Sequence, residues 1–346
     1  MANIYDVAKR AGVSVATVSA VINRSSYVSE PLQERVQKAI AELNYSPNLL
    51  ARSLAQRRTH TLGILVPDVA NPFFPEIVRG AEDKANDAGY MIILGNSDNQ
   101  IVKEEMYLNL FLSKRVDGIL LVKAAGDLSN ALFEMLRRAG PPVVLIDREY
   151  SHLGVDTVVA DDSGGAYTGT RHLLKLGHRR IGIVIGIPNA STTQGRLLGY
   201  REALASRGVP FDPELVVQGD YGIESGYAAG LAVLAKSPSA VFVTNYMMTI
   251  GFMKALEKEK LRCPQDVAVV SYDDFTWNEV FHPRLTCVVQ PKYLIGYRAA
   301  EILLSRIQKK HKRVRLEVLQ NDFVVRESSG RKLEKALRKG VGSAGS

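Results

Sequence analysis

The chain is poor in cysteine and has no long apolar run. Among its 346 residues only Cys263 and Cys287 are cysteines, too few for a disulfide framework or a cysteine-ligated zinc site. No run of about 18 apolar residues is present, so we expect no transmembrane helix and no membrane partner. The first ten residues, MANIYDVAKR, carry charges and lack an apolar signal core, which predicts a cytoplasmic protein.

Sequence motifs of common enzymes and metal sites are missing as well. The six histidines are scattered without HExxH spacing, and neither a GxxxxGK[ST] phosphate loop nor a GxSxG elbow occurs. The GxGxxG motif at 340–345 follows no predicted strand and opens no predicted helix. Adjacent Asp273 and Asp274 could suggest acid–base chemistry, but side chains adjacent in sequence point in different directions. We therefore expect neither an enzyme nor a bound metal or cofactor.

Length and charge indicate several domains and an anionic partner. A chain of 346 residues corresponds to roughly two or three domains, and 46% apolar residues are ordinary for a globular protein. The formal net charge is +8, and residues 1–58 hold eight Lys and Arg against four Asp and Glu. A second basic run, KKHKRVR, occupies 309–315. Such segments suggest nucleic acid or another polyanion, although a solvated charged face is the alternative.

Apolar residues in the first 45 positions recur with helical spacing. The three sets are Ile4, Val7, Ala8 and Ala11, then Val15, Val18, Val21 and Ile22, then Val36, Ile40 and Leu43. Gly12 between the first two sets is a turn residue, and Ser14 and the Ser29–Pro31 segment are helix-start signals. Three short helices of this kind indicate a helix-turn-helix module that places a helix in the DNA major groove. A helical cap on the larger domain is the alternative.

The segment from Asn3 to Leu54 resembles the DNA-binding headpiece of the lac repressor family of bacterial transcription regulators. The similarity is carried almost without gaps by IYDVAKRAGVSVATVSAVIN and VSEPLQERVQKAIAELNYSPNLLARSL. It implies that Val15 and Ala16 occupy the two variable base-reading positions. It also implies further DNA contacts, mostly to phosphates, from Tyr5, Ser14, Thr17, Ser19 and Asn23. Most family members have arginine where this chain has Ala20, which puts the usual operator sequence in doubt, and Ala20 could contact a thymine methyl instead.

The residues after the headpiece, SPNLLARSLAQRRTHT, are interpreted as a hinge. Pro47 favours a break before it, and the next eight residues could form about two helical turns, which are marginal in water. The resemblance implies a hinge helix that orders against its twin from a second protomer in the minor groove. The implied DNA contacts come from Asn48, Ala51 and Leu54, with Leu54 as a wedge between base pairs. We therefore expect a homodimer on a near-palindromic double-stranded operator, with a plain linker as the alternative.

From Leu62 onward, short apolar strands alternate with helical segments. The predicted strands are TLGILVPDV, YMIILGN, VDGILLV and PPVVLID, then, after Asp161, RIGIVIG, LVVQGD, AVFVTN and VAVVSYDD. Helices are predicted at Pro75–Gly89 and Val102–Ser113. Such alternation predicts parallel sheets covered on both faces, and its restart predicts two similar subdomains. The expected fold class is α/β, with an all-α helix-turn-helix headpiece and two doubly wound parallel-sheet subdomains.

Polar and aromatic residues follow several predicted strands, where doubly wound sheets bind ligands. They are Asn71, Phe73, Phe74, Asp147, Arg148, Arg196, Asn245, Asp273 and Gln290. A strand-end Asp or Asn is often only a cap. As a set, however, carboxylates, amides and guanidinium groups can saturate a ring of hydroxyls, while aromatic faces cover the apolar sides of a sugar.

Residues from Leu62 to about Ser328 resemble the periplasmic sugar-binding-protein fold that the lac repressor family shares. The nine residues match the pocket of ribose-type binding proteins position for position, which implies that they bind a sugar, with Tyr221 as a further aromatic wall. One departure is Tyr246, because the family usually has Asp there. A Tyr246 ring that faces the ligand would alter the fit, whereas an outward ring would not. We expect Trp277 on the rim of this pocket.

These interpretations divide the chain into four parts. We expect a headpiece at 1–46, a hinge helix and linker at 47–61, an effector-binding and dimerisation domain at 62–330, and a basic flexible tail at 331–346. The N-subdomain is expected at about 62–160 and 292–322, and the C-subdomain at about 163–290 and 323–330. The tail contains one Leu-x3-Leu spacing, which is too short for a tetramerising coil, so a dimer is expected.

The sequence thus predicts a homodimeric transcriptional repressor controlled by a small effector. The favoured effector is a ribose-like monosaccharide bound between the two subdomains. A purine is the alternative within the family, because two phenylalanines could stack on a base. A periplasmic sugar-binding protein is the alternative of another class, which the headpiece in residues 1–58 and the missing signal core disfavour.

Overall fold

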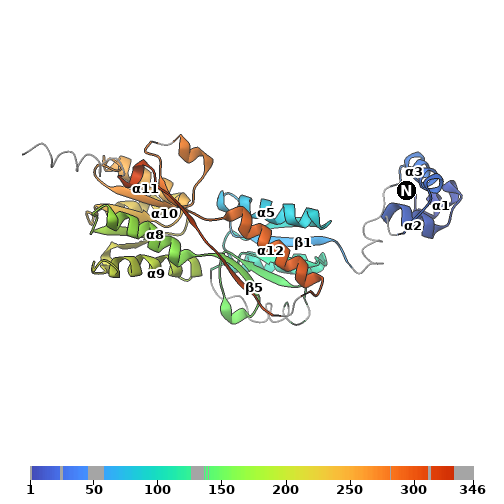
Figure 1. The fold of residues 1–346 in the computed structure, drawn as a ribbon, viewed down its shortest axis with the longest axis horizontal. Helices are drawn as coiled ribbons and strands as arrows, with labels where there is room; N and C mark the ends of the chain where they lie inside the picture. The colour runs from blue at the N-terminus through green and yellow to red at the C-terminus, as the bar shows by residue number, and fades with distance from the viewer. Residues whose placement is uncertain are drawn as a thin grey trace, which may run out of the picture. The chain divides into compact units, whose positions relative to one another are not determined.

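A computed structural model gives the fold of the chain (Figure 1). It describes residues 2–23, 26–45, 58–125, 136, 138, 140–280, 282–310 and 313–330. The chain divides into two compact units, Met1–His60 and Thr61–Ser346, and each has apolar core residues of its own. Within the described residues, no helix is both long and apolar enough to cross a membrane.

The N-terminal unit contains the three helices that the sequence predicts. They are α1 (Ile4–Ala11), α2 (Val15–Asn23) and α3 (Glu30–Glu42). Asn3 caps α1 by accepting from the backbone N–H groups of Tyr5 and Asp6, a helix-start signal that the sequence analysis missed. The buried apolar residues of this unit are Val7, Ala8, Ala11, Val18, Val36 and Ala39. The amphipathic faces of the helices therefore meet in one small core.

A sharp turn joins α1 to α2. Gly12 ends α1 with a φ of 63°, a left-handed conformation that favours glycine. Arg35 of α3 donates from Nη2 to the carbonyl oxygens of Ala11 at 2.6 Å and Gly12 at 3.2 Å. Ser14 accepts from the backbone N–H of Thr17 at 3.1 Å, which caps α2 as the sequence predicts. The third helix thus holds the turn that orients the second.

The C-terminal unit contains two six-stranded sheets. The first has the order β11-β5-β4-β3-β1-β2, and its strands are all parallel. They are β1 (Thr61–Val66), β2 (Met91–Asn96), β3 (Gly118–Leu121), β4 (Val143–Ile146), β5 (Asp156–Ala160) and β11 (Leu316–Leu319). Helices α5 (Phe73–Asp87) and α12 (Lys292–Ile307) cover one face, and α6 (Ile101–Ser113) covers the other. This half is the N-subdomain.

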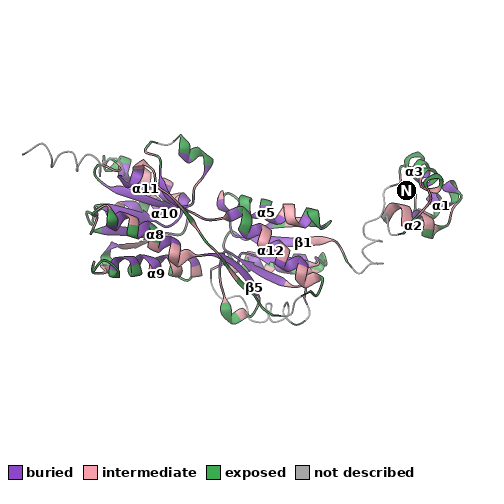
Figure 2. Ribbon diagram, in the orientation of Figure 1, coloured by how far each residue is buried: buried purple, intermediate pink, exposed green. Residues whose placement is uncertain are grey.

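The second sheet has the order β12-β10-β9-β8-β6-β7, in which only the β10–β12 pair is antiparallel. Its strands are β6 (Ile181–Ile185), β7 (Val216–Gln218), β8 (Ala240–Val243), β9 (Ala268–Tyr272), β10 (Thr286–Val289) and β12 (Asp322–Val324). Helices α8 (Asp162–Lys175) and α9 (Ser191–Ala205) cover one face. Helices α10 (Ile223–Leu234) and α11 (Tyr246–Lys258) cover the other. This half is the C-subdomain, and Figure 2 shows the buried strands between the helical layers of both halves.

The predicted architecture of two doubly wound subdomains is confirmed, but the sequence analysis did not predict β5, β10, β11 and β12. Each of these strands has only three to five residues. The edge strands β11 and β12 are never fully buried, so they lack the continuous apolar run that marks a central strand. The chain passes between the two sheets after β5, after β10 and after β11. These crossings place the junction beside the carboxyl ends of both sheets.

Candidate functional site

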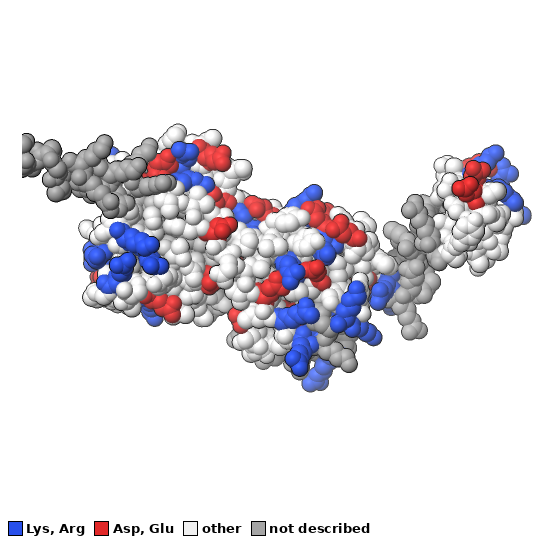
Figure 3. Space-filling view, viewed as in Figure 1, with Lys and Arg blue, Asp and Glu red and all other residues white. Residues whose placement is uncertain are grey.

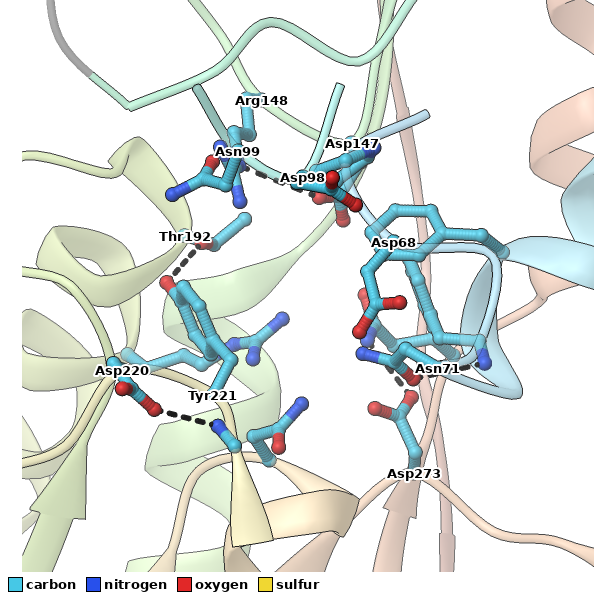
Figure 4. A pocket seen from close by; sticks show the side chains of 17 residues that line it. Asp68, Asn71, Asp98, Asn99, Asp147, Arg148, Thr192, Asp220, Tyr221 and Asp273 are labelled. Atoms are coloured by element: carbon cyan, nitrogen blue, oxygen red, sulfur yellow. Dashed lines mark hydrogen bonds and ion pairs between the residues drawn. The ribbon is translucent and has the colours of Figure 1, made fainter. Parts of the chain in front are cut away.

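A cavity of about 360 Å³ lies between the two subdomains, at the carboxyl ends of their strands (Figure 4). The ten residues that the sequence analysis selected as effector-binding all line it: Asn71, Phe73, Phe74, Asp147, Arg148, Arg196, Tyr221, Asn245, Asp273 and Gln290. Residues that are distant in the chain therefore meet around one space. Their role in binding a ligand stays a prediction.

Two aspartates occupy matching positions in the two subdomains. Asp147 directly follows β4, and Asp273 directly follows β9. Their φ angles are 66° and 70°, in the left-handed region that Asp tolerates better than most residues. Their backbone N–H groups donate to Val158 at 3.0 Å and Val288 at 2.7 Å, which are carbonyls of the neighbouring strands. This backbone turn directs each carboxylate to the cavity.

Two asparagines hold fixed orientations at helix starts. Asn71 Oδ1 accepts from the backbone N–H of Phe73 at 3.1 Å, and Asn245 Oδ1 accepts from that of Met248 at 3.0 Å. These bonds assign the amide orientation, because a reversed amide would place an N–H group against another N–H group. Each Nδ2 group therefore remains a donor on a residue that lines the cavity.

Arg196 is held on the C-subdomain side by three contacts. Its Nε donates to Asp162 at 2.7 Å, its Nη1 donates to the Thr244 carbonyl at 2.6 Å, and its guanidinium lies 3.9 Å from the centre of the Tyr272 ring. Burial lowers the pKa of Arg196, because it disfavours the charged guanidinium. The nearby Asp162 carboxylate has the larger opposing effect, so the pKa of Arg196 lies above its ordinary value. Burial raises the pKa of Asp162 to about 7 against the opposing effect of Arg196. The side chain is thus a rigid, charged donor.

Arg148 and Gln290 each keep one unpaired polar atom. Arg148 Nη1 donates to Asn99 Oδ1 at 2.7 Å and to the Lys123 carbonyl at 2.8 Å, whereas its buried Nε has no hydrogen-bond partner and lies 3.9 Å from Asp147 Oδ2. Gln290 Nε2 donates to Asp273 at 2.9 Å, whereas its buried Oε1 has none. Burial raises the pKa of Asp273 above its ordinary value, although Arg196 opposes this effect. The residues that line the cavity therefore include one donor, Arg148 Nε, and one acceptor, Gln290 Oε1, that have no hydrogen-bond partner.

The aromatic lining comes from both subdomains. Phe73 and Phe74 meet edge to face, with ring centres 5.1 Å apart and an interplanar angle of 86°. The Tyr221 hydroxyl hydrogen-bonds to Thr192 at 3.1 Å and to Thr193 at 2.6 Å. A Cβ atom on Gly186 would lie 2.0 Å from the Tyr221 ring, so only glycine leaves room for the ring in this place.

Part of the lining was not predicted from the sequence, and the predicted place of one residue is wrong. The additional lining residues are Pro67, Asp68, Asp98, Asn99, Thr192, Asp220 and Gly222. Asp98 and Asn99 follow β2 closely, so the rule of reading strand ends would have found them. Trp277 does not line the cavity, so its expected place on the rim is wrong; its ring packs 5.7 Å from the Tyr246 ring. Tyr246 is buried away from the cavity lining, which is the outward arrangement.

The expected DNA-reading residues lie on α2 and near the start of α1. Tyr5 is 71% exposed, and Ser14 and Ala16 are exposed as well. Thr17, Ser19 and Ala20 are half-buried, and half-buried Val15 packs against the headpiece core. The side chain of Asn23 and the hinge residues Asn48, Ala51 and Leu54 lie outside the described residues. The exposed face of α2 therefore presents small polar and apolar groups rather than charges.

A three-helix module with an exposed second helix, followed by two α/β subdomains around a polar cavity, defines a class of DNA-binding regulators with a ligand-binding domain. The family model described as "Bacterial regulatory proteins, lacI family" matches residues 3–48. The model described as "Periplasmic binding proteins and sugar binding domain of LacI family" matches residues 59–326. The chain belongs to the LacI family of bacterial transcriptional regulators.

Similar proteins support this assignment along the whole chain. The HTH-type transcriptional repressor PurR of Photobacterium profundum is 36% identical over 331 residues, which cover 95% of this chain and 98% of the relative. The solved complex of the transcriptional regulator CelR with cellobiose is 35% identical, with a TM-score of 0.73 and coverage of 95% and 100%. The lac repressor dimer bound to operator and the anti-inducer ONPF is 27% identical, with a TM-score of 0.85 and coverage of 95% and 99%. PurR and the lac repressor are repressors, and LacI-family repressors bind operators and small effectors as dimers.

Proposed function

We propose that this protein is a homodimeric repressor whose affinity for its operator is controlled by a neutral polyhydroxylated effector, a ribose-like monosaccharide. The observation that carries the proposal is the mixed polarity of the cavity, in which buried donors and buried acceptors surround one space. A hydroxyl group both donates and accepts hydrogen bonds, so a compact ring of hydroxyls can satisfy such a lining.

The unpaired atoms of the lining specify what the effector must offer. Gln290 Oε1 has no hydrogen-bond donor, and Arg148 Nε has no hydrogen-bond acceptor, since Asp147 Oδ2 lies 3.9 Å away in an ion pair. The amide orientation of Gln290 is fixed, because a reversed amide would place its oxygen against the Asp273 carboxylate. A buried polar atom without a partner costs roughly 1–3 kcal/mol, so an effector that pairs with both atoms recovers this free energy. The carboxylates of Asp147 and Asp273 add acceptors for further hydroxyl groups.

The charge of the lining favours an uncharged effector. Five aspartates line the cavity, Asp68, Asp98, Asp147, Asp220 and Asp273. The only basic side chains of the lining, within the described residues, are Arg148 and Arg196. An excess of carboxylates repels phosphate and carboxylate groups. A sugar phosphate is therefore disfavoured, and a neutral sugar is favoured.

A purine is the second candidate effector. It is favoured by the relatives named PurR and by the two phenylalanines of the lining. The perpendicular rings of Phe73 and Phe74 allow a flat base to stack on only one of them, which weakens this candidate. CelR, which is about as similar to this chain as PurR is, has been solved in complex with the sugar cellobiose, and this favours a sugar.

The proposed control couples the cavity to DNA through the angle between the subdomains. Asp147 belongs to the N-subdomain and Asp273 to the C-subdomain, so an effector held by both changes the relative stability of open and closed arrangements. The dimer interface would pass this change to the hinge at 47–61. A coupling free energy of about 1–3 kcal/mol changes operator affinity roughly 5- to 150-fold.

The proposed DNA-binding part consists of the headpiece at 1–46 and the hinge. The proposed contacts are those expected from the sequence: Tyr5, Ser14, Val15, Ala16, Thr17, Ser19, Ala20, Asn23, Asn48, Ala51 and Leu54. The exposed positions of Tyr5, Ser14 and Ala16 support this part of the proposal. The effector and dimerisation domain would span 62–330, and the protein would act in the cytoplasm, where its operator is.

Titration calorimetry with a panel of effectors tests the proposal. The panel contains ribose and other pentoses, hexoses, cellobiose, ribose 5-phosphate, hypoxanthine and guanine, added to the full-length protein. We expect saturable binding of one neutral sugar and none of the phosphate. Operator binding is then measured with and without that sugar. Binding of a purine but of no sugar would overturn the sugar assignment, and binding that leaves operator affinity unchanged would overturn the control mechanism.

A further inference from the structure

The N-subdomain carries a basic surface that the effector cavity does not use. Because its six strands are parallel, the segments that precede them emerge together at the end of the sheet opposite the cavity. Helix α12 ends there too, because Arg306 pairs with Asp156 at the start of β5. Figure 3 shows Lys and Arg side chains gathered at this end of the subdomain, around the end of α12. We call this region the strand-start pole.

The pole is formed by segments that are scattered along the sequence. Besides Arg306, its described basic residues are exposed: Lys114, Arg115, Arg138, Lys309, Lys310, Arg313 and Arg315. The described carboxylates of the same segments are Asp87, Asp117 and Asp156, and Asp156 is buried beside Arg306. The corresponding end of the C-subdomain also carries exposed Lys and Arg, but ion pairs such as Arg180–Asp212 and Arg262–Asp266 neutralise part of its charge. The strand-start pole therefore has a clear excess of positive charge.

We propose that the strand-start pole is a second DNA-contacting surface, which binds phosphates of the duplex that flanks the operator. This inference rests on the proposed binding of the operator by the headpiece. The first strand of the subdomain, β1, starts at the pole with Thr61. Residues 46–60 link the described headpiece to β1, and such a segment spans at most about 50 Å. Flanking duplex of about 15 base pairs on each side of the operator is roughly 50 Å long, which matches this longest span.

The chemistry of the pole suits phosphates rather than bases. Lys114, Lys310 and Arg313 are exposed and make no ion pair with any other described residue. Long basic side chains on an open surface attract the phosphate backbone and release its counterions, without reading sequence. The pole would thus add affinity, salt dependence and orientation to the sequence-specific contacts of the headpiece.

A charge-neutralising variant tests the inference against a matched control. Lys114→Gln/Lys310→Gln/Arg313→Gln removes three exposed charges from the pole. The control, Lys175→Gln/Arg207→Gln/Lys260→Gln, removes three exposed charges from the strand-start end of the C-subdomain. An operator is first selected from a random duplex library with the full-length wild-type protein. It is then embedded in duplexes of about 20 and about 50 base pairs, and dissociation constants are measured over a salt series.

We expect the pole variant to lose affinity for the long duplex roughly tenfold or more near 0.1 M salt, with a salt slope lower by up to about five, because each protomer of the proposed homodimer loses three charges. Its affinity for the short duplex should match that of wild type and control, which also shows that the headpiece is intact. Equal salt slopes of the wild type, the pole variant and the control variant on the long duplex would overturn the inference. An acidic protein would then be the remaining class of partner for the pole. If the wild-type protein selects no duplex from the library, both the proposed function and the inference about the strand-start pole are wrong.

Discussion

Glu104 is a buried carboxyl group behind the cavity, and its replacement by glutamine tests the electrostatics of this region. The side chain lies on α6 with no exposed surface. Its Oε2 accepts from the backbone N–H of Ala124, and its Oε1 has no hydrogen-bond partner. Burial raises the pKa of Glu104 to about 7, although the Ala124 N–H and the charges of Lys123 and Arg148 oppose this effect. At neutral pH the ionised form of Glu104 is therefore costly to keep in the folded state.

The size and sign of the effect follow from proton linkage. A pKa raised from 4.5 to about 7 corresponds to about 3 kcal/mol, at about 1.4 kcal/mol for each pH unit. Because the folded state holds the proton more tightly, the penalty is absent below pH 4.5, grows as the pH rises to about 7 and is complete above that value. Glu104→Gln keeps an acceptor for Ala124 and removes the charge. We expect the variant to be more stable than wild type by a few kcal/mol at pH 8 and nearly equal to it at about pH 4.5.

Urea unfolding of both proteins across this pH range measures the difference in the free energy of unfolding. Glu105→Gln, a half-buried neighbour on the same helix, is the matched control and should alter the pH dependence much less than Glu104→Gln, because the charge of Glu105 is the smallest contribution to the raised pKa of Glu104. A Glu104→Gln protein that is less stable than wild type at pH 8 would refute the reasoning. That result would mean that the carboxylate is ionised and acts as the counter-ion of Lys123 and Arg148.

Three further predictions concern the cavity and the headpiece. Asp273→Asn keeps a side chain that tolerates the left-handed backbone but loses charged hydrogen bonds to hydroxyls, so calorimetry should show effector affinity lower by roughly 100-fold; a change below about threefold would exclude a contact. Gly186→Ala places a Cβ atom against the Tyr221 ring, so effector binding should weaken while operator binding without effector persists; unchanged affinity would contradict the tight contact. Arg35→Ala removes two bonds to the α1–α2 turn, which should destabilise the headpiece by roughly 1–3 kcal/mol and speed hydrogen exchange of residues 4–23; equal exchange would speak against this role.

Part of the cavity lining could be predicted from the sequence, because some lining residues directly follow recognisable strands. Asp147 and Asp273 end apolar runs that are easily recognised, and the carboxyl ends of parallel strands meet at one edge. The same rule applies to Asp98 and Asn99, which were nevertheless missed. The place of Trp277 could not be predicted, because its position depends on how the short helix at Thr276–Glu279 packs against α11. Sequence distance from Asp273 carries no information about that packing.

The sequence by itself determined the helices of the headpiece and the alternation of strands and helices, because these depend on local spacing of apolar, capping and turn residues. The family was indicated by the resemblance of the headpiece and the cavity residues to the lac repressor family. Only the tertiary structure decided which atoms remain unpaired around the cavity, such as Arg148 Nε and Gln290 Oε1. It also decided that basic residues from three separate segments share one pole of the N-subdomain. The physical reason is that non-local pairing of parallel strands sets which chain ends meet, and side-chain packing then fixes which hydrogen bonds are left open.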